Sequence, residues 1–139
     1  MHVSFDKQAW DAFKSYDRPG PIHMINLLQF HETAAYDDGR EIAGAQAYAE
    51  YGRLSAPVFQ RVGGRIVWRG AFELMMIGPD AATWDLCFIA EYPSVAAFIE
   101  MSRDPAYREA VVHRQAAVRN SRLMRTAPIE RGTSFASSG

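Results

Sequence analysis

The segment WDLCFIAEYPSVAAFIEM, residues 84–101, constrains the fold more than any other part of the sequence. It begins with the strict alternation and the aromatic and β-branched side chains of a strand. The pattern breaks at Tyr-Pro-Ser, residues 92–94, and continues at once with helical spacing. Ser94 is suited to cap a helix over 95–102, and Asp104 predicts the start of a second helix that runs to about Asn120.

The rest of the chain divides at proline and glycine clusters such as DRPGP, residues 17–21. Apolar residues at helical spacing predict helices, and apolar runs between breakers predict strands. We expect Ser4 to cap the first helix. Besides the corner described above, the expected elements are a helix over 4–16, a strand over 22–30, a loop over 31–44, a helix over 45–62, and strands over 65–77, 84–92 and 121–129.

After the first helix, the expected order is strand, helix, strand, strand, helix, strand. This order is typical of the α+β ferredoxin-like fold, βαββαβ, in which a four-stranded antiparallel sheet carries helices on one face. We assign the domain to 21–129, preceded by an extra N-terminal helix and linker over 1–20. The tail over 130–139 is small and polar, and we expect it to be disordered.

The strand over 84–92 is apolar on both faces. Leu86, Phe88 and Ala90 point one way, and Cys87 and Ile89 point the other way. A helix layer covers only one face of a sheet, so the second face needs another cover. The same face of a second copy is the simplest cover. We therefore expect a homodimer that forms through the sheet faces.

Composition and charge exclude several partners. The 139 residues include 15 basic and 16 acidic side chains, which give a net charge of −1. Nucleic acid or an anionic membrane would need a clustered basic surplus, so we expect neither as a partner. The start MHVSFDKQAW is too polar for a signal peptide, and no apolar run reaches about 18 residues. We therefore expect a cytoplasmic protein.

The stretch from Gly64 to Arg114, GRIVWRGAFELMMIGPDAATWDLCFIAEYPSVAAFIEMSRDPAYREAVVHR, resembles the family catalogued as domain of unknown function thirteen-thirty. MINLLQF in the first strand, GAQAYAEY in the first core helix and SRLM in the last strand support the resemblance, which covers roughly residues 21–128. The order and spacing of these motifs agree together, although no single motif is decisive.

The resemblance implies membership of the dimeric α+β barrel superfamily, in which two ferredoxin-like chains pair sheet to sheet. Relatives there include cofactor-independent antibiotic-biosynthesis monooxygenases, muconolactone isomerase, ethyl-ester-degradation proteins and haem enzymes such as chlorite dismutase. Kinship of fold to such varied chemistry does not specify a reaction. The resemblance therefore implies a fold, a dimer and the position of a pocket.

Arg114 and His113 are the candidate catalytic pair. Arg114 falls within the apolar stripe of the last helix, seven residues after Tyr107. A guanidinium there must have a partner. The partner is either internal, in an ion pair or a backbone-carbonyl clamp, or it is an anionic or carbonyl-bearing ligand. His113 lies at the edge of the stripe, where it either makes an ordinary hydrogen bond or carries a proton. The pair also resembles the His-Arg step of the family.

Five further residues are candidate ligand contacts, each with a structural alternative. Asn26 is a polar residue in an apolar strand, where its amide needs partners in the core or in a pocket. Tyr48 and Tyr51 share one side of a helix and suit core packing with hydroxyls that reach a partner. Trp68 suits the core, a dimer interface or a ligand shelf. Tyr92 lies where strand 84–92 turns into the next helix.

No metal or cofactor motif is present. The histidines lack the H-E-x-x-H spacing, DDGRE lacks the calcium-loop ligand period, and no glycine-rich phosphate loop follows a strand. No serine occupies an elbow motif. We expect no cofactor and no metal.

Two functions of different classes remain. One is a cofactor-independent enzyme, of isomerase or monooxygenase type, acting on a carbonyl- or enol-bearing organic acid or aromatic compound. The other is a non-catalytic dimeric ligand-binding or stress-related protein. An enzyme pocket should bring His113 and a second polar group to an open cavity, whereas a binding protein needs only the cavity.

Overall fold

The four strands form one antiparallel sheet in the order β2-β3-β1-β4. In the computed structural model, which describes residues 1–136, the strands are β1 (Ile22–Phe30), β2 (Arg65–Gly70), β3 (Leu86–Tyr92) and β4 (Val118–Thr126). The helices are α1 (Lys7–Ser15), α2 (Gly44–Arg61), α3 (Val95–Arg103) and α4 (Pro105–Ala117). Apart from α1 and the division of the last helical region into α3 and α4, this is the predicted βαββαβ order, and the ferredoxin-like fold is confirmed.

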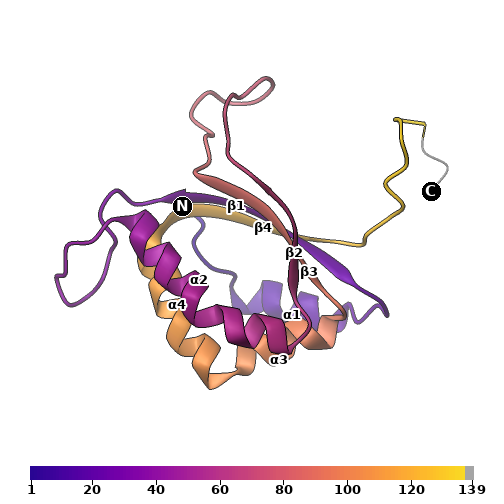
Figure 1. Cartoon of the computed structure of the whole chain (residues 1–139), viewed down its shortest axis with the longest axis horizontal. Helices are drawn as coiled ribbons and strands as arrows, with labels where there is room; N and C mark the ends of the chain where they lie inside the picture. Colours follow the sequence, from indigo (N-terminus) through magenta and orange to yellow (C-terminus); the bar gives the residue numbers. More distant parts are fainter. Residues whose placement is uncertain (137–139) are drawn as a thin grey trace.

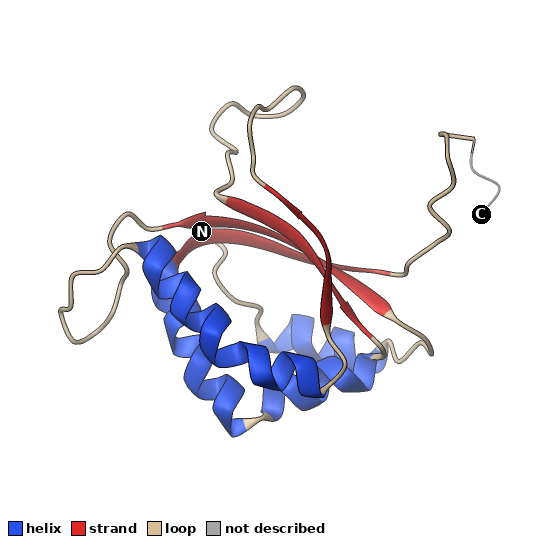
Figure 2. Ribbon diagram, viewed as in Figure 1, coloured by secondary structure: helices blue, strands red, loops and turns tan. Residues whose placement is uncertain are grey.

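All four helices lie on one side of the sheet, and the other face carries none (Figures 1 and 2). α2 and α4 pack against each other, and α1 and α3 lie towards the opposite end of the helix layer. The loop after β2 projects from the sheet on the side away from the helices. This arrangement leaves one sheet face open and places the core between the other face and the helices.

The predicted corner at Tyr-Pro-Ser is confirmed. Ser94 Oγ accepts a hydrogen bond from Ala97 N at 3.1 Å and caps α3. Asp104 caps α4 and accepts from Ala106 N at 2.8 Å, with Pro105 at the first helical position. The two helices follow each other with a single intervening residue because the extended backbone of Asp104 ends one helix and begins the next.

Several predicted boundaries are wrong, and the first of them is the start of the first helix. It begins at Lys7, not at residue 4, because Asp6 and not Ser4 supplies the cap: Asp6 Oδ1 accepts from Ala9 N at 2.8 Å. Residues 1–5 are instead an extended arm. The Asp6 carboxylate is a strong cap because its negative charge lies at the positive end of the helix.

The other corrections concern the end of β2 and the boundary between α4 and β4. β2 ends at Gly70, although the apolar pattern continues to Ile77, because β3 begins only at Leu86 and leaves residues 71–77 without a pairing partner. α4 ends at Ala117, not near Asn120, and β4 spans 118–126 instead of 121–129. Val118 is fully buried and pairs with Phe30, so sheet pairing begins where helix continuation was expected.

The N-terminal segment is part of the packed body. Trp10 and Phe13 of α1 pack on the core, and the Phe13 ring lies 4.8 Å from that of Phe98 in α3. At the other terminus, residues 130–136 form no helix or strand and are exposed. Residues 137–139 of the predicted disordered tail lie outside the described part of the chain.

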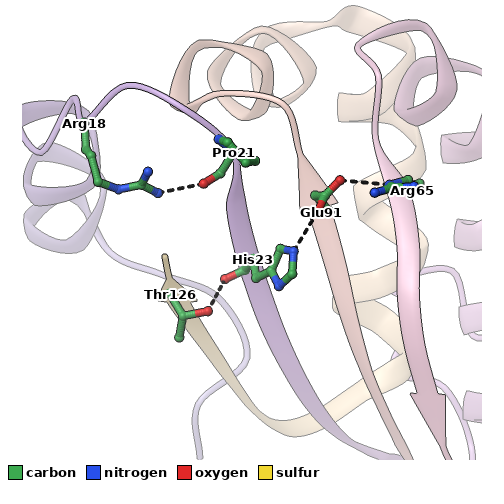
Figure 3. A network of polar contacts seen from close by, with 6 residues as sticks. All are labelled: Arg18, Pro21, His23, Arg65, Glu91 and Thr126. Atoms are coloured by element: carbon green, nitrogen blue, oxygen red, sulfur yellow. Dashed lines mark hydrogen bonds and ion pairs between the residues drawn. The ribbon is translucent and has the colours of Figure 1, made fainter. Parts of the chain in front are cut away.

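The open face combines apolar side chains with one polar row. His23 Nε2 lies 2.7 Å from Glu91 Oε2, and Arg65 Nε donates to Glu91 Oε1 at 2.8 Å, so that the contacts cross β1, β3 and β2 (Figure 3). These hydrogen bonds lower the pKa of Glu91, that from His23 having the larger effect. Trp68 and Met124 belong to the same face. Trp68 pairs with Ile89 and is 50% exposed, and Met124 pairs with Ile25 and is 44% exposed.

Candidate functional site

A cavity of about 1140 Å³ lies between the sheet and the helix layer. Its floor is the helix-facing side of the sheet, where the register places Asn26, Phe88, Arg69 and Leu123 in one row across all four strands. Its roof comes from α2, α3 and α4. Ligand cavities in proteins commonly measure about 300–1,000 Å³, so this one can accommodate a small organic molecule.

Tyrosines from α2 and α4 line the roof. Tyr51 and Tyr107 hydrogen-bond through their hydroxyls at 2.8 Å, and the Tyr48 ring contacts that of Tyr51 at a tilt of 45°, with ring centroids 5.2 Å apart. Burial raises the pKa of Tyr48, Tyr51 and Tyr107 above its usual value. These phenols are therefore protonated at neutral pH, and they can donate hydrogen bonds but cannot act as bases.

The Tyr48 hydroxyl has no hydrogen-bond partner among residues 1–136. Within that range, no fully buried side-chain nitrogen or oxygen lacks a partner. The Tyr48 hydroxyl therefore borders the open space of the cavity, which Tyr48 lines. It is a free hydrogen-bond donor for a ligand.

Asn26 and Tyr92 also line the cavity. Asn26 is buried, and its Nδ2 donates to Met24 O at 3.1 Å. Tyr92 is buried at the end of β3, where its hydroxyl approaches Met101 Sδ at 3.9 Å. Burial raises the pKa of Tyr92 as well. Each residue thus has a structural contact and a place in the cavity wall.

Arg114 joins the cavity to the N-terminal arm, residues 1–5. Its Nη1 donates to Val3 O at 2.6 Å, which is the backbone-carbonyl clamp that the sequence left open as one alternative. Ser121 Oγ donates to His2 O at 2.7 Å, and His2 N donates to Asn120 Oδ1 at 3.0 Å. The arm is thereby held between α4 and β4, and its residues 2–5 line the cavity.

Two of the predicted site residues are not in the cavity lining. His113 Nδ1 lies 2.5 Å from the Tyr36 hydroxyl, on the side of α4 that meets the loop before α2. Trp68 lies on the open face opposite Ile89. The structure therefore brings together Asn26, Tyr48, Tyr51, Tyr92 and Arg114, and places His113 and Trp68 elsewhere.

The charges in the cavity lining all have one sign. Five arginines contribute atoms to the lining, and no aspartate or glutamate of the described residues does: the arginines are Arg65, Arg69, Arg108, Arg114 and Arg122. Arg65 and Arg122 pair with Glu91 and Leu27 on the open-face side of the sheet, so the guanidinium groups available to the cavity are those of Arg69, Arg108 and Arg114. Much of the remaining lining is apolar or aromatic. Arg69, Arg108 and Arg122 were not predicted as lining residues, because their positions depend on strand register and helix packing.

A second cavity, of about 450 Å³, lies between α1 and the sheet. It is lined largely by apolar and aromatic groups, and its two guanidinium groups are already engaged. Arg125 donates to Phe13 O at 3.1 Å and to Tyr16 O at 2.5 Å, and Arg18 donates to Pro19 O and Pro21 O at 2.8 Å. This space offers a ligand little polar recognition. Among residues 1–136, no three His, Cys, Asp or Glu side chains gather as a metal site requires.

The fold and the cavity define a ferredoxin-like α+β protein with a small-molecule-sized internal space. The chain belongs to the family described as domain of unknown function (DUF1330), whose model matches residues 27–126. This match confirms the family resemblance of the sequence. No curated protein matches the chain.

Solved structures agree with this assignment. The methylated RPA0582 protein is 59% identical over 95% of this chain and 98% of its own, with a TM-score of 0.93. A second structure, with a TM-score of 0.90, 59% identity and coverage of 93% and 98%, describes RPA0582 as a protein of unknown function from Rhodopseudomonas palustris.

More distant structures share the fold alone. SnoaB, a cofactor-independent oxygenase from Streptomyces nogalater, is 14% identical over 85% of this chain and 99% of its own, with a TM-score of 0.52. A dimeric ferredoxin-like protein of unknown function from Thermobifida fusca is 17% identical over 81% and 95%, with a TM-score of 0.51.

The described helices also bear on membrane association. None of those within residues 1–136 combines the length and the apolar character that crossing a bilayer demands.

Proposed function

We propose that this protein binds a small apolar organic anion, such as an aromatic acid, in the cavity between the sheet and the helices. The observation that carries this proposal is the single sign of charge in a largely apolar lining, to which Arg69, Arg108 and Arg114 contribute and no carboxylate of residues 1–136 does. Guanidinium groups at the border of a largely apolar space favour a ligand that brings a negative charge. The apolar floor favours a ligand whose remaining body is hydrocarbon.

The geometry supports binding better than turnover. An isomerase or a cofactor-independent monooxygenase acting on a carbonyl- or enol-bearing acid would need a group that removes a proton. His113 is engaged by Tyr36 outside the cavity lining, and the tyrosines that line the cavity stay protonated. Tyr48 and Asn26 could stabilise an enolate oxygen by hydrogen bonds, so a substrate that ionises by itself is the case in which enzymatic activity would fit this site.

The binding proposal is tested with 8-anilinonaphthalene-1-sulfonate, an apolar anion whose fluorescence rises in apolar surroundings. We expect saturable binding that weakens by about ten-fold or more in Gly52→Trp, because a bulky ring would obstruct the cavity. Gly52 lines the cavity, and a side chain added there meets no other atom within 4 Å. The new ring therefore enters open space instead of the packed core.

Ala49→Trp is the matched control. Ala49 is an exposed residue of the same helix and is not in the cavity lining, so the ring is added without narrowing the cavity. Its affinity for the probe should equal that of the unmodified protein. Equal affinity of all three proteins, with unchanged melting temperatures, would place the probe elsewhere and contradict the proposed function.

We also propose a homodimer that forms through the open sheet face. Trp68 and Met124 are half-exposed there, and Leu74, Met76 and Ile77 are exposed in the loop that projects on the same side. A second copy would remove this apolar surface from water. The polar row of His23, Glu91 and Arg65 would lie at one end of such an interface.

A further inference from the structure

We infer that Arg69 and Tyr48 form the subsite for the anionic group of the ligand, a carboxylate or sulfonate, and that Phe88 supports the adjoining apolar body. The inference rests on the proposed function, since it concerns the same cavity. It assigns the recognition of charge to Arg69 of the edge strand β2, a residue that was not among the candidates from the sequence.

The register of β2 directs Arg69 to the cavity. Ile66 pairs with Ala90 on the helix-facing side, and the register then shifts before Trp68. After this irregularity, Trp68 pairs with Ile89 on the open face and Arg69 pairs with Phe88 on the helix-facing side. An inserted residue in a strand reverses the faces of those that follow it. Arg69 therefore lies beside Phe88 in the row that forms the cavity floor.

Arg69 is a free cation in this lining. Arg114 donates to Val3 O, Arg65 donates to Glu91, and Arg122 donates to Ser121 O at 2.8 Å. Arg69 has no hydrogen bond or ion pair with any of the described residues. Its guanidinium can therefore take a ligand anion without giving up an internal partner.

Tyr48 supplies the second donor. Its hydroxyl borders the cavity and has no partner among residues 1–136. Arg114 and Arg69 both oppose the rise in the pKa of Tyr48 that burial causes, Arg114 having the larger effect. Both guanidinium groups therefore act electrostatically at this hydroxyl. Arg108 also lines the cavity without a side-chain partner among the described residues, but of the lining arginines only Arg114 and Arg69 act on Tyr48. Because Arg114 already holds the N-terminal arm, Arg69 and Tyr48 are the pair placed to contact one anion.

This arrangement favours one class of ligand. A planar guanidinium binds the two oxygens of a carboxylate or sulfonate, and a phenol donates to one of them. The Phe88 ring beside Arg69 favours an aromatic or other flat apolar body directly attached to the anionic group. The ligand class is therefore an aryl carboxylate or aryl sulfonate, not a small hydrophilic anion.

The experiment compares two fluorescent probes that differ only in charge. They are 8-anilinonaphthalene-1-sulfonate and the neutral N-phenyl-1-naphthylamine, which has the same rings without the sulfonate. Both are titrated into the unmodified protein, Arg69→Gln, Tyr48→Phe and Arg103→Gln. Arg103 is an unpaired arginine of α3 that is not in the cavity lining, so its replacement controls for the loss of one positive charge.

We expect the unmodified protein to prefer the sulfonate by about ten-fold, the size of a charge-assisted hydrogen-bond contribution. Arg69→Gln should bring the two affinities to within about three-fold of each other, mainly by weakening the sulfonate. Tyr48→Phe should reduce the preference less, and Arg103→Gln should leave it unchanged. A melting curve of each variant confirms that the comparison is made between folded proteins.

Different failures have different meanings. If both probes bind the cavity with equal affinity in the unmodified protein, or if Arg69→Gln keeps the full preference for the sulfonate, the subsite is refuted while the cavity remains a binding site. If probe binding is insensitive to Gly52→Trp, the proposed function fails and the subsite falls with it.

Discussion

Arg114 illustrates how one side chain serves two parts of the molecule. Its guanidinium borders the cavity and also holds the backbone of Val3, which is 111 positions away in the sequence. From the sequence, the arginine on the apolar stripe demanded a partner, and two kinds of partner were open. Nothing in the local pattern indicated that the N-terminal arm would be that partner, because long-range contacts leave no periodic signal.

At the same scale, Glu91 should make stability depend on pH. Hydrogen bonds from His23 and Arg65 hold the pKa of Glu91 below its usual value of 4.5. The ionised carboxylate therefore stabilises the folded state above that pH, and this contribution is lost as the pH falls through the lowered pKa. We expect Glu91→Gln to lower the free energy of unfolding by about 1 kcal/mol at pH 7.

The measurement is urea unfolding of both proteins from pH 7 to pH 3. The difference between them should shrink below pH 4.5, where the unmodified protein loses its advantage. Glu73→Gln is the control, because Glu73 lies in the exposed loop after β2 and has no partner among the described residues. A difference that grows as the pH falls would contradict the role given to Glu91.

The candidate site could be predicted in part, and the misplaced residues have identifiable causes. Tyr48, Tyr51 and Asn26 lie in the lining because their elements and faces followed directly from periodicity. His113 is adjacent in sequence to Arg114 but points away, because successive helical residues are rotated by about 100°. Trp68 lies on the open face because the irregularity in β2 reverses which side chains face the helices. The pattern of apolar residues in the sequence does not indicate this irregularity.

At the scale of the elements, the sequence predicted the type and order of every helix and strand but not all of their ends. The length of a strand depends on the strand with which it pairs. β2 therefore ends at Gly70, where its pairing with β3 ends, although apolar residues continue to Ile77. Some ends with a local signal were predicted correctly, although the cap expected at Ser4 was not. The cap at Ser94 is such a signal, because its hydroxyl satisfies a backbone N–H of the same helix turn.

Ser94 should therefore contribute measurably to stability. Ser94→Ala removes the acceptor of the Ala97 N–H, and we expect a loss of about 1 kcal/mol in the free energy of unfolding. For a domain of this size, the melting temperature should fall by about 3 °C. Differential scanning calorimetry measures both. Ser94→Asp retains a capping oxygen and should recover most of the loss, whereas equal losses in the two variants would show that the hydroxyl acts otherwise than as a cap.

At the scale of the whole molecule, the open sheet face predicts self-association. Light scattering after size-exclusion chromatography should give about twice the chain mass of 15.6 kDa at micromolar concentration. Trp68→Glu combined with Met124→Glu should give the mass of one chain. Both side chains are half-exposed in the single chain, so burying the new carboxylates is costly only in the dimer.

Val112→Glu is the matched control for this prediction. Val112 is 53% exposed, much like the two replaced residues, but it belongs to α4 on the helix side of the molecule. The control should keep the doubled mass. A single-chain mass for the unmodified protein would exclude the dimer, and dissociation by Val112→Glu alone would move the interface to the helix layer.

The N-terminal arm has a consequence for how the family is compared. The family model matches residues 27–126, whereas one side of the cavity is built by residues 2–5. The shared segment therefore specifies the roof and most of the floor of the cavity, but not Asn26 in the floor or the wall formed by the arm. Two members with the same core can enclose spaces of different shape by varying a few residues before the domain. Transferring a ligand from one member to another therefore requires comparing the segments outside the family boundaries as well.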